Sequence, residues 1–135
     1  MKTAAHRYTS EVSFADTDAS GWAHFSKILT FVEQAEHDLF AKLGISVFDP
    51  ASSGWPRAHI SCDYRSPLKF REYFEVYLKL SKLGASALNW EFEILKADGC
   101  LAAEGEMVSV KVGPDGKPTR LSEEEHAKIE SISLT

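Results

Sequence analysis

The chain has 135 residues, of which 44% are hydrophobic and 26% are charged, as in ordinary globular domains. Its 20 acidic and 15 basic side chains give a net charge of −5, which argues against a general binder of nucleic acid or of anionic membranes. No apolar run approaches the roughly 18 residues of a membrane helix, and the first residues lack the apolar region of a signal peptide. We therefore expect one cytoplasmic domain over residues 1–135.

The two cysteines are too far apart to form a recognisable motif. Cys62 and Cys100 show neither a CxxC pattern nor the spacing of a zinc site. A disulfide framework is therefore not expected, and an intracellular, reducing compartment is the simpler interpretation.

The first predicted strand covers Tyr8 to Phe14, where apolar and polar side chains alternate and Phe14 lies on the buried face. Turn residues follow from Asp16 to Gly21. The next run predicts a helix from about Ser26 to Leu43, because apolar residues recur at three- and four-residue spacing over a wide stripe. Gly44 is suited to end this helix.

Four further strands are predicted without a second long helix. The alternating segments cover residues 57–65, 73–80, 88–94 and 100–112, and a phase change near Gly105 indicates a bulge there. Asp98-Gly99 is a hairpin signal, and Ser122 with Glu125 matches a capping box that opens a short C-terminal helix. This order predicts an α+β fold in which a five-stranded antiparallel sheet curls around one long helix.

The junction between the first strand and the long helix carries the strongest chemical signal. Asp16 and Asp18 lie in its turn, and the helix start leaves backbone N–H groups unpaired at the positive end of the helix dipole. An ionised carboxylate beside such donors suits a reaction that develops an oxyanion. We therefore place the candidate active site here; the alternative is that both aspartates only shape the turn.

The order of elements and this motif together resemble the hot-dog fold thioesterases, specifically the 4-hydroxybenzoyl-CoA thioesterase family and its short-chain acyl-CoA relatives. The similarity lies in Asp16-Thr17-Asp18-Ala19-Ser20-Gly21, in Phe14 before it and in the helix segment Phe31-Val32-Glu33-Gln34-Ala35. A second block, from Ser61 to Phe70, is similar to the Asp-Tyr-x-x-Pro-Leu strand end of this family.

The resemblance implies hydrolysis of an acyl-CoA thioester to free acid and CoA, without a metal or bound cofactor. It implies Asp18 as the catalytic carboxylate, acting as nucleophile or general base, and the N–H of Phe25 as the donor to the thioester carbonyl. It also implies a homodimer or homotetramer with active sites at subunit interfaces. One branch of the family has Tyr-His where this chain has His24-Phe25, so the histidine of that branch has no counterpart at Phe25.

Six residues are candidates for substrate binding. Trp22 and Tyr64 could line an acyl pocket beside Gly21, with core packing as the alternative, and His24 could bond the substrate or pack at an interface. Lys82 and Arg120 only loosely match basic positions of the resembled family, so their interpretation as contacts to the CoA phosphates competes with that of surface charge.

Other functions remain open at this stage. Glu33 and His37 lie four residues apart on one helix face. They could serve as a second carboxylate and a base, or they could be a solvated or subunit-facing pair. A GxSxG nucleophile motif is absent. The alternatives are a non-catalytic hot-dog module that binds acyl-CoA or acyl carrier protein, a thioesterase acting on acyl carrier protein, and a hot-dog dehydratase. The choice between an aromatic and an aliphatic acyl group also stays open.

Overall fold

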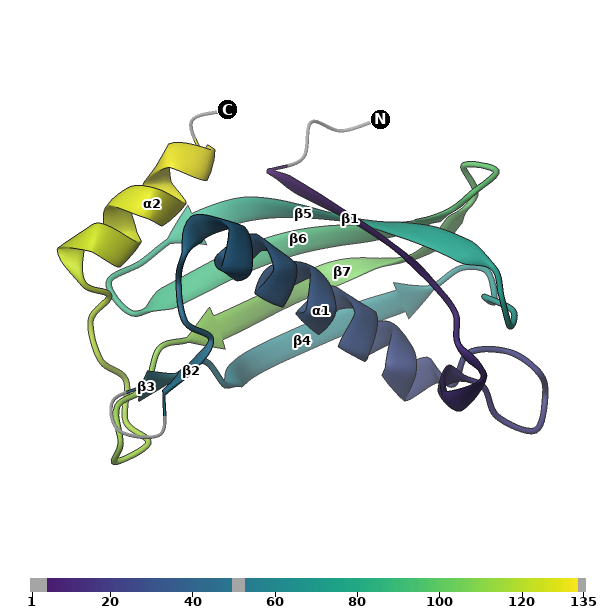
Figure 1. The fold of residues 1–135 in the computed structure, drawn as a ribbon, viewed down its shortest axis with the longest axis horizontal. Coiled ribbons are helices and arrows are strands. Elements are labelled where there is room, and N and C mark those ends of the chain that lie inside the picture. The colour runs from purple at the N-terminus through teal and green to yellow at the C-terminus, as the bar shows by residue number, and fades with distance from the viewer. Residues whose placement is uncertain (1–4, 50–52, 134–135) are drawn as a thin grey trace.

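The computed structural model describes residues 5–49 and 53–133, and its centre is a five-stranded antiparallel sheet around one long helix (Figure 1). The strands lie in the order β1-β5-β6-β7-β4, and helix α1 crosses one face of the sheet. The predicted α+β hot-dog architecture is thereby confirmed. The elements are β1 (His6–Glu11), η1 (Phe14–Asp16), α1 (Phe25–Leu43), β2 (Phe48–Asp49), β3 (Ser53–Gly54), β4 (Arg57–Tyr64), β5 (Tyr73–Leu83), β6 (Ala87–Lys96), β7 (Leu101–Val110) and α2 (Glu123–Ser133).

Helix α1 buries its apolar stripe against the sheet, as its spacing predicts. Phe31 stacks on Phe74 of β5 with 4.4 Å between the ring centroids, and both side chains are almost fully buried. The helix ends at Gly44, whose φ of 72° is left-handed and therefore favours glycine. The predicted bounds of this helix differ from the observed ones only at the first residue, Phe25.

The first strand is shorter than the alternation predicts. It ends at Glu11, and the chain turns at η1, where the carboxylate of Asp16 accepts hydrogen bonds from the N–H and the hydroxyl of Ser13, each 2.9 Å long. Phe14 is consequently 76% exposed, so its predicted place on the buried face is wrong. A capping interaction at Ser13 therefore ends the strand before its last apolar residue.

The bulge predicted at Gly105 lies three residues earlier. Ile94 pairs with Ala103 and Leu95 with Leu101, which leaves Ala102 as the extra residue of β7. The ladder continues through Gly105, which is needed for close packing: a Cβ there would lie 1.9 Å from the backbone oxygen of Ser61. The glycine therefore allows two strands to approach each other, and the phase change comes from Ala102.

Strand β4 also departs from simple alternation. A register shift between Arg57 and His59 leaves Ala58 exposed, although its spacing predicts that it shares a face with Ile60 and Cys62.

The C-terminal helix is as predicted, because Ser122 and Glu125 exchange the two hydrogen bonds of a capping box, 2.8 and 3.0 Å long.

The described residues offer neither a membrane-spanning helix nor a cluster of metal ligands. None of the helices in residues 5–49 and 53–133 is both long and apolar enough to cross a membrane. The same residues hold no group of three or more His, Cys, Asp or Glu side chains placed to bind a metal ion.

Candidate active site

Asp18 lies in a tight turn between η1 and α1, and its side chain is exposed. Its Oδ1 accepts a hydrogen bond from the N–H of Ser20 at 2.8 Å and another from the Ser20 hydroxyl. Its backbone carbonyl accepts the N–H of Gly21 at 3.0 Å, and Gly21 has a φ of 84°. The turn therefore needs glycine at position 21. It holds Oδ1 of Asp18 by hydrogen bonds, whereas no group of the described chain is hydrogen-bonded to Oδ2.

These hydrogen bonds also govern the charge of Asp18. The Ser20 hydroxyl and N–H stabilise the carboxylate and lower the pKa of Asp18 below its ordinary value of 3.8. The Asp18 carboxyl group is therefore ionised at neutral pH.

The start of α1 leaves one backbone donor free. From Ser20 to Lys27, every backbone N–H except that of Phe25 is donated to an acceptor of the described chain. The acceptors are Asp18 Oδ1, Asp18 O, Ser20 Oγ, Leu68 O, Asp16 O, His24 Nδ1 and His24 O. Phe25 is the first residue of α1, so its free N–H points out of the positive end of the helix dipole.

His24 is the N-cap of this helix. Its Nδ1 accepts the N–H of Ser26 at 3.3 Å and lies 2.8 Å from the Ser26 hydroxyl, and its ring packs on that of Phe25 with centroids 4.6 Å apart. The sequence predicts His24 near the site but not its role as N-cap. By accepting the Ser26 N–H, the His24 side chain stabilises the first turn of α1.

We expect His24→Ala to lower the free energy of unfolding by about 1 kcal/mol, the usual cost of losing an N-cap. His24→Asn should retain most of that stability, because the asparagine side chain caps a helix well. Urea denaturation of the two variants and the wild type checks this. Equal destabilisation by alanine and asparagine would mean that the imidazole stabilises the protein by something other than capping.

An apolar groove of about 260 Å³ adjoins the helix start. Three of the predicted residues meet there: Trp22, Phe25 and Tyr64 are 47%, 63% and 48% exposed, and the rings of Phe25 and Tyr64 meet edge to face with 6.4 Å between centroids. The rest of the lining comes from the turn before α1, from α1, from the loop after β4 and from the bulge of β7: Ala23, Ile28, Arg65, Ser66, Pro67, Leu68 and Ala102.

The bulge of β7 fixes the shape of this groove. The backbone carbonyl of Ala102 accepts the N–H groups of Arg65 and Ser66, at 2.8 and 3.1 Å, and so holds the loop that follows β4. The carbonyl of Leu68 in the same loop accepts the N–H of Ala23 at 2.7 Å. The groove, the bulge and the helix start are therefore tied by backbone hydrogen bonds, as is common for bulges beside functional sites.

The two basic candidates lie elsewhere in the chain. Glu11, which precedes the Asp18 turn, pairs with Tyr73 at the start of β5, whereas Lys82 is near the other end of that strand, about 30 Å away. Arg120 precedes Leu121, whose N–H bonds the carbonyl of Ala85 in the turn after β5. Within one chain, Lys82 and Arg120 are therefore at the far end of the sheet from Asp18.

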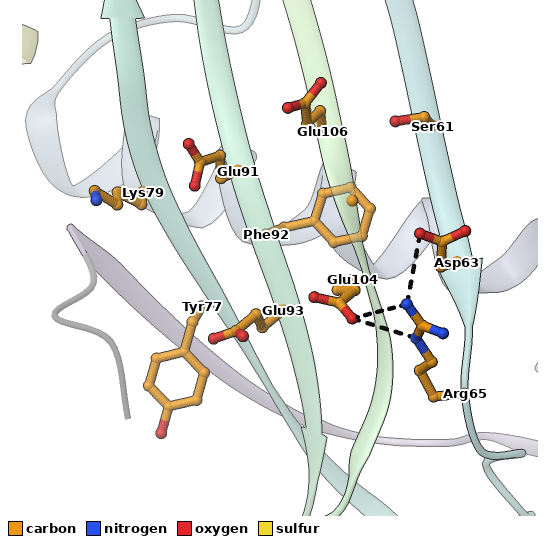
Figure 2. Close-up of a pocket in the computed structure, with 11 residues that line it drawn as sticks. Ser61, Asp63, Arg65, Tyr77, Lys79, Glu91, Phe92, Glu93, Glu104 and Glu106 are labelled. Atoms are coloured by element: carbon orange, nitrogen blue, oxygen red, sulfur yellow. Dashed lines mark hydrogen bonds and ion pairs between the residues drawn. The ribbon is translucent and has the colours of Figure 1, made fainter.

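A second hollow, of about 360 Å³, lies on the sheet face away from α1 (Figure 2). Its walls carry five carboxylates and two cations, and glutamates stand opposite one another at Glu91–Glu106 and Glu93–Glu104. Arg65 bridges Asp63 and Glu104 at 3.7 and 3.2 Å. This surplus of negative charge repels phosphate groups, so the hollow is unsuited to a CoA-type ligand.

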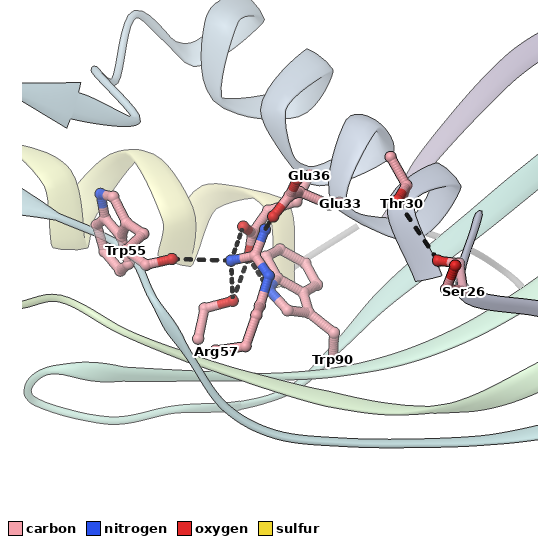
Figure 3. Close-up of polar contacts among 8 residues, drawn as sticks. Ser26, Thr30, Glu33, Glu36, Trp55, Arg57 and Trp90 are labelled. Atoms are coloured by element: carbon pink, nitrogen blue, oxygen red, sulfur yellow. Dashed lines mark hydrogen bonds and ion pairs between the residues drawn. The ribbon is translucent and has the colours of Figure 1, made fainter. Parts of the chain in front are cut away.

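The structure contains a buried polar cluster that the sequence pattern did not indicate (Figure 3). The Glu36 side chain on α1 is fully buried, and its Oε2 accepts hydrogen bonds from Trp90 Nε1 and Ser109 Oγ, each 2.7 Å long. Its Oε1 lies 2.8 Å from Nη1 of Arg57, an ion pair without hydrogen-bond geometry. Spacing could have revealed it, because Glu36 is four residues from both Val32 and Phe40 on the apolar stripe.

A five-stranded antiparallel sheet curled around one long helix is the fold of the hot-dog thioesterases. The sequence profile of the thioesterase-like superfamily matches residues 12–129, and the chain belongs to that family. This membership confirms the expected class of enzyme and the expected family resemblance.

Individual relatives agree with this assignment. A 1,4-dihydroxy-2-naphthoyl-CoA hydrolase from Synechococcus sp. (strain CC9605) is 31% identical over 103 residues, which cover 67% of this chain and 69% of that protein. The crystal structure of a 1,4-dihydroxy-2-naphthoyl-CoA thioesterase from Synechocystis superposes with a TM-score of 0.82 at 21% identity, covering 96% and 95% of the two chains. A Staphylococcus aureus protein solved in complex with CoA gives a TM-score of 0.86 at 16% identity, with coverages of 96% and 84%.

Proposed function

We propose that this protein hydrolyses an acyl-CoA thioester to the free acid and CoA, with Asp18 and the Phe25 N–H as its catalytic groups. The observation that carries the proposal is the pairing of an ionised carboxylate with the one free backbone donor of the helix start. The similarity to a 1,4-dihydroxy-2-naphthoyl-CoA hydrolase supports a CoA thioester as the substrate.

In the proposed reaction the Phe25 N–H donates to the thioester carbonyl oxygen and stabilises the negative charge that develops there. Asp18 attacks the carbonyl carbon directly, or removes a proton from the water that does so. A C–O bond forms, the C–S bond breaks, and the CoA thiolate leaves and takes up a proton. The direct route gives an anhydride with Asp18 that water then hydrolyses to the same products.

The groove beside Phe25 is proposed to hold the acyl group. Trp22 and Tyr64 offer exposed aromatic rings there, with Gly21 and His24 at the turn and helix start beside them. Aromatic walls accept a flat ring by stacking, and they also accept an aliphatic chain, so both kinds of acyl group are candidate substrates.

We propose that the active enzyme is a homodimer or homotetramer. Lys82 and Arg120 are exposed and lie at the far end of the sheet from the Asp18 of their own chain, so we propose that they contact the phosphates of a CoA whose thioester lies at the Asp18 of a partner subunit. In the described sheet β4 is an edge strand, with one side open to pair with a second copy. The cytoplasmic location expected from the sequence is part of this proposal.

The test is release of free thiol from a panel of acyl-CoAs with aromatic, short aliphatic and medium aliphatic groups, together with an acyl carrier protein carrying the same groups. We expect turnover of at least one CoA thioester, and the panel then names the acyl class. If only the carrier-protein thioesters are hydrolysed, the substrate is an acyl carrier protein and not an acyl-CoA. Tight binding of acyl-CoA without any thiol release would contradict hydrolysis and favour a binding module.

A further inference from the structure

Tyr64 makes a contact that a pocket-lining residue does not need. Its hydroxyl donates a hydrogen bond to the backbone carbonyl of Phe25, with 3.2 Å between the oxygens. Tyr64 is the last residue of β4 and pairs with Ala103 of β7, so the sheet holds its backbone. The bond therefore connects the sheet to the first residue of α1.

We propose that Tyr64 is a positioning residue that fixes the backbone of Phe25 and thereby aims the Phe25 N–H at the substrate carbonyl. This inference rests on the proposed function, because it concerns the donor that the proposed hydrolysis uses.

The peptide groups on either side of Phe25 show how this positioning works. The peptide between Phe25 and Ser26 is held at both ends: its carbonyl accepts from Tyr64, and its N–H donates to Nδ1 of His24. The peptide before Phe25 is held at its carbonyl, because His24 O accepts the N–H of Lys27 at 2.8 Å. Only the N–H of Phe25 is left without an acceptor, and its direction follows from the bonds around it.

Of the hydrogen bonds to the two peptide groups beside Phe25, only the one from the Tyr64 hydroxyl comes from a residue of the sheet. The His24 and Lys27 bonds are internal to the helix start, so they set its local shape but not its place above the groove. The Tyr64 hydroxyl stays a donor over the working pH range, because burial and the neighbouring Cys62 raise the pKa of Tyr64 above its ordinary value of 10.0.

Tyr64→Phe tests this directly, since it removes the hydroxyl and keeps the ring that meets Phe25. We expect kcat to fall roughly tenfold with KM within about twofold of the wild type, because an oxyanion donor acts in the transition state and small misplacements slow the reaction. The matched control is Tyr73→Phe on β5, an exposed tyrosine outside the groove, which should leave both constants unchanged. A rise in KM alone would overturn the inference and make Tyr64 a substrate contact.

A second readout does not depend on turnover. We expect Tyr64→Phe to shift the amide resonances of Phe25 and Ser26 and to speed hydrogen exchange at the Ser26 amide, whereas Tyr73→Phe leaves both residues unchanged. Unchanged resonances of Phe25 and Ser26 in Tyr64→Phe would overturn the inference even if the enzyme is active. If the wild type cleaves no thioester but these resonances shift, hydrolysis fails as the function while the positioning contact stands.

Discussion

Replacing Asp18 by asparagine is expected to lower kcat/KM for the best acyl-CoA substrate by a factor of about 100 to 10,000. The substitution keeps the size of the side chain and an oxygen that can accept from Ser20, but it removes the charge that the nucleophile or general base requires. The measurement is thiol release by wild type and variant at equal concentrations.

The matched control is Asp98→Asn. Asp98 is also an exposed aspartate in a tight turn, its Oδ1 accepts the N–H of Cys100 at 2.9 Å, and hydrogen bonds to Cys100 lower its pKa as those to Ser20 lower that of Asp18. Its loss should therefore disturb a turn without changing kcat/KM. If Asp18→Asn is as active as Asp98→Asn, Asp18 is only a turn residue and the proposed site is wrong.

The pH dependence should follow the ionised form of Asp18. Its pKa lies below the ordinary value of 3.8, so the carboxylate is the populated form throughout the neutral and mildly acidic range. Activity that depends on the carboxylate is lost only as the pH falls through this lowered pKa. We therefore expect kcat/KM to show no decline attributable to Asp18 down to about pH 5. A decline of the wild-type kcat/KM above pH 5 that is absent from the pH profile of Asp18→Asn would contradict this expectation.

The fold was predictable because its signals are local and periodic. The wide stripe of α1 and the alternation along β5 and β6 require one helix against one sheet, and Gly44 marks the helix end by its left-handed conformation. The turn at Asp18 was predictable for the same reason, since aspartate, serine and glycine have strong turn preferences.

The remaining features depend on contacts between distant residues. The bulge at Ala102 arises from pairing with β6, and its carbonyl holds the loop after Tyr64, so the alternation within β7 alone misplaces it at Gly105. The free N–H of Phe25 was expected from the resemblance, but its isolation depends on Leu68 and Asp16 accepting the neighbouring donors. Such long-range bonds leave no periodic trace in the sequence.

The largest effect on stability is expected at Arg57, which reaches from the edge strand β4 to the buried Glu36 of α1. Its side chain is 19% exposed, and Nη1 also donates to the carbonyl of Trp55 and to Ser109 Oγ, each at 3.0 Å. Arg57→Met should lower the free energy of unfolding by about 3–5 kcal/mol, because it leaves the Glu36 carboxylate buried without its counter-charge. Urea denaturation at neutral pH measures this loss.

A matched arginine and a double variant separate the causes of that loss. Arg65→Met removes an arginine with two ion pairs that is 52% exposed, and it should cost less than about 1 kcal/mol. Adding Glu36→Gln to Arg57→Met should recover part of the stability, because the amide keeps an acceptor for Trp90 and Ser109 and carries no charge. Glu36 is bonded to β6 and β7, and Arg57 belongs to β4, so the cluster holds α1 to three strands. If Arg57→Met lowers the free energy of unfolding no more than Arg65→Met does, this role is refuted.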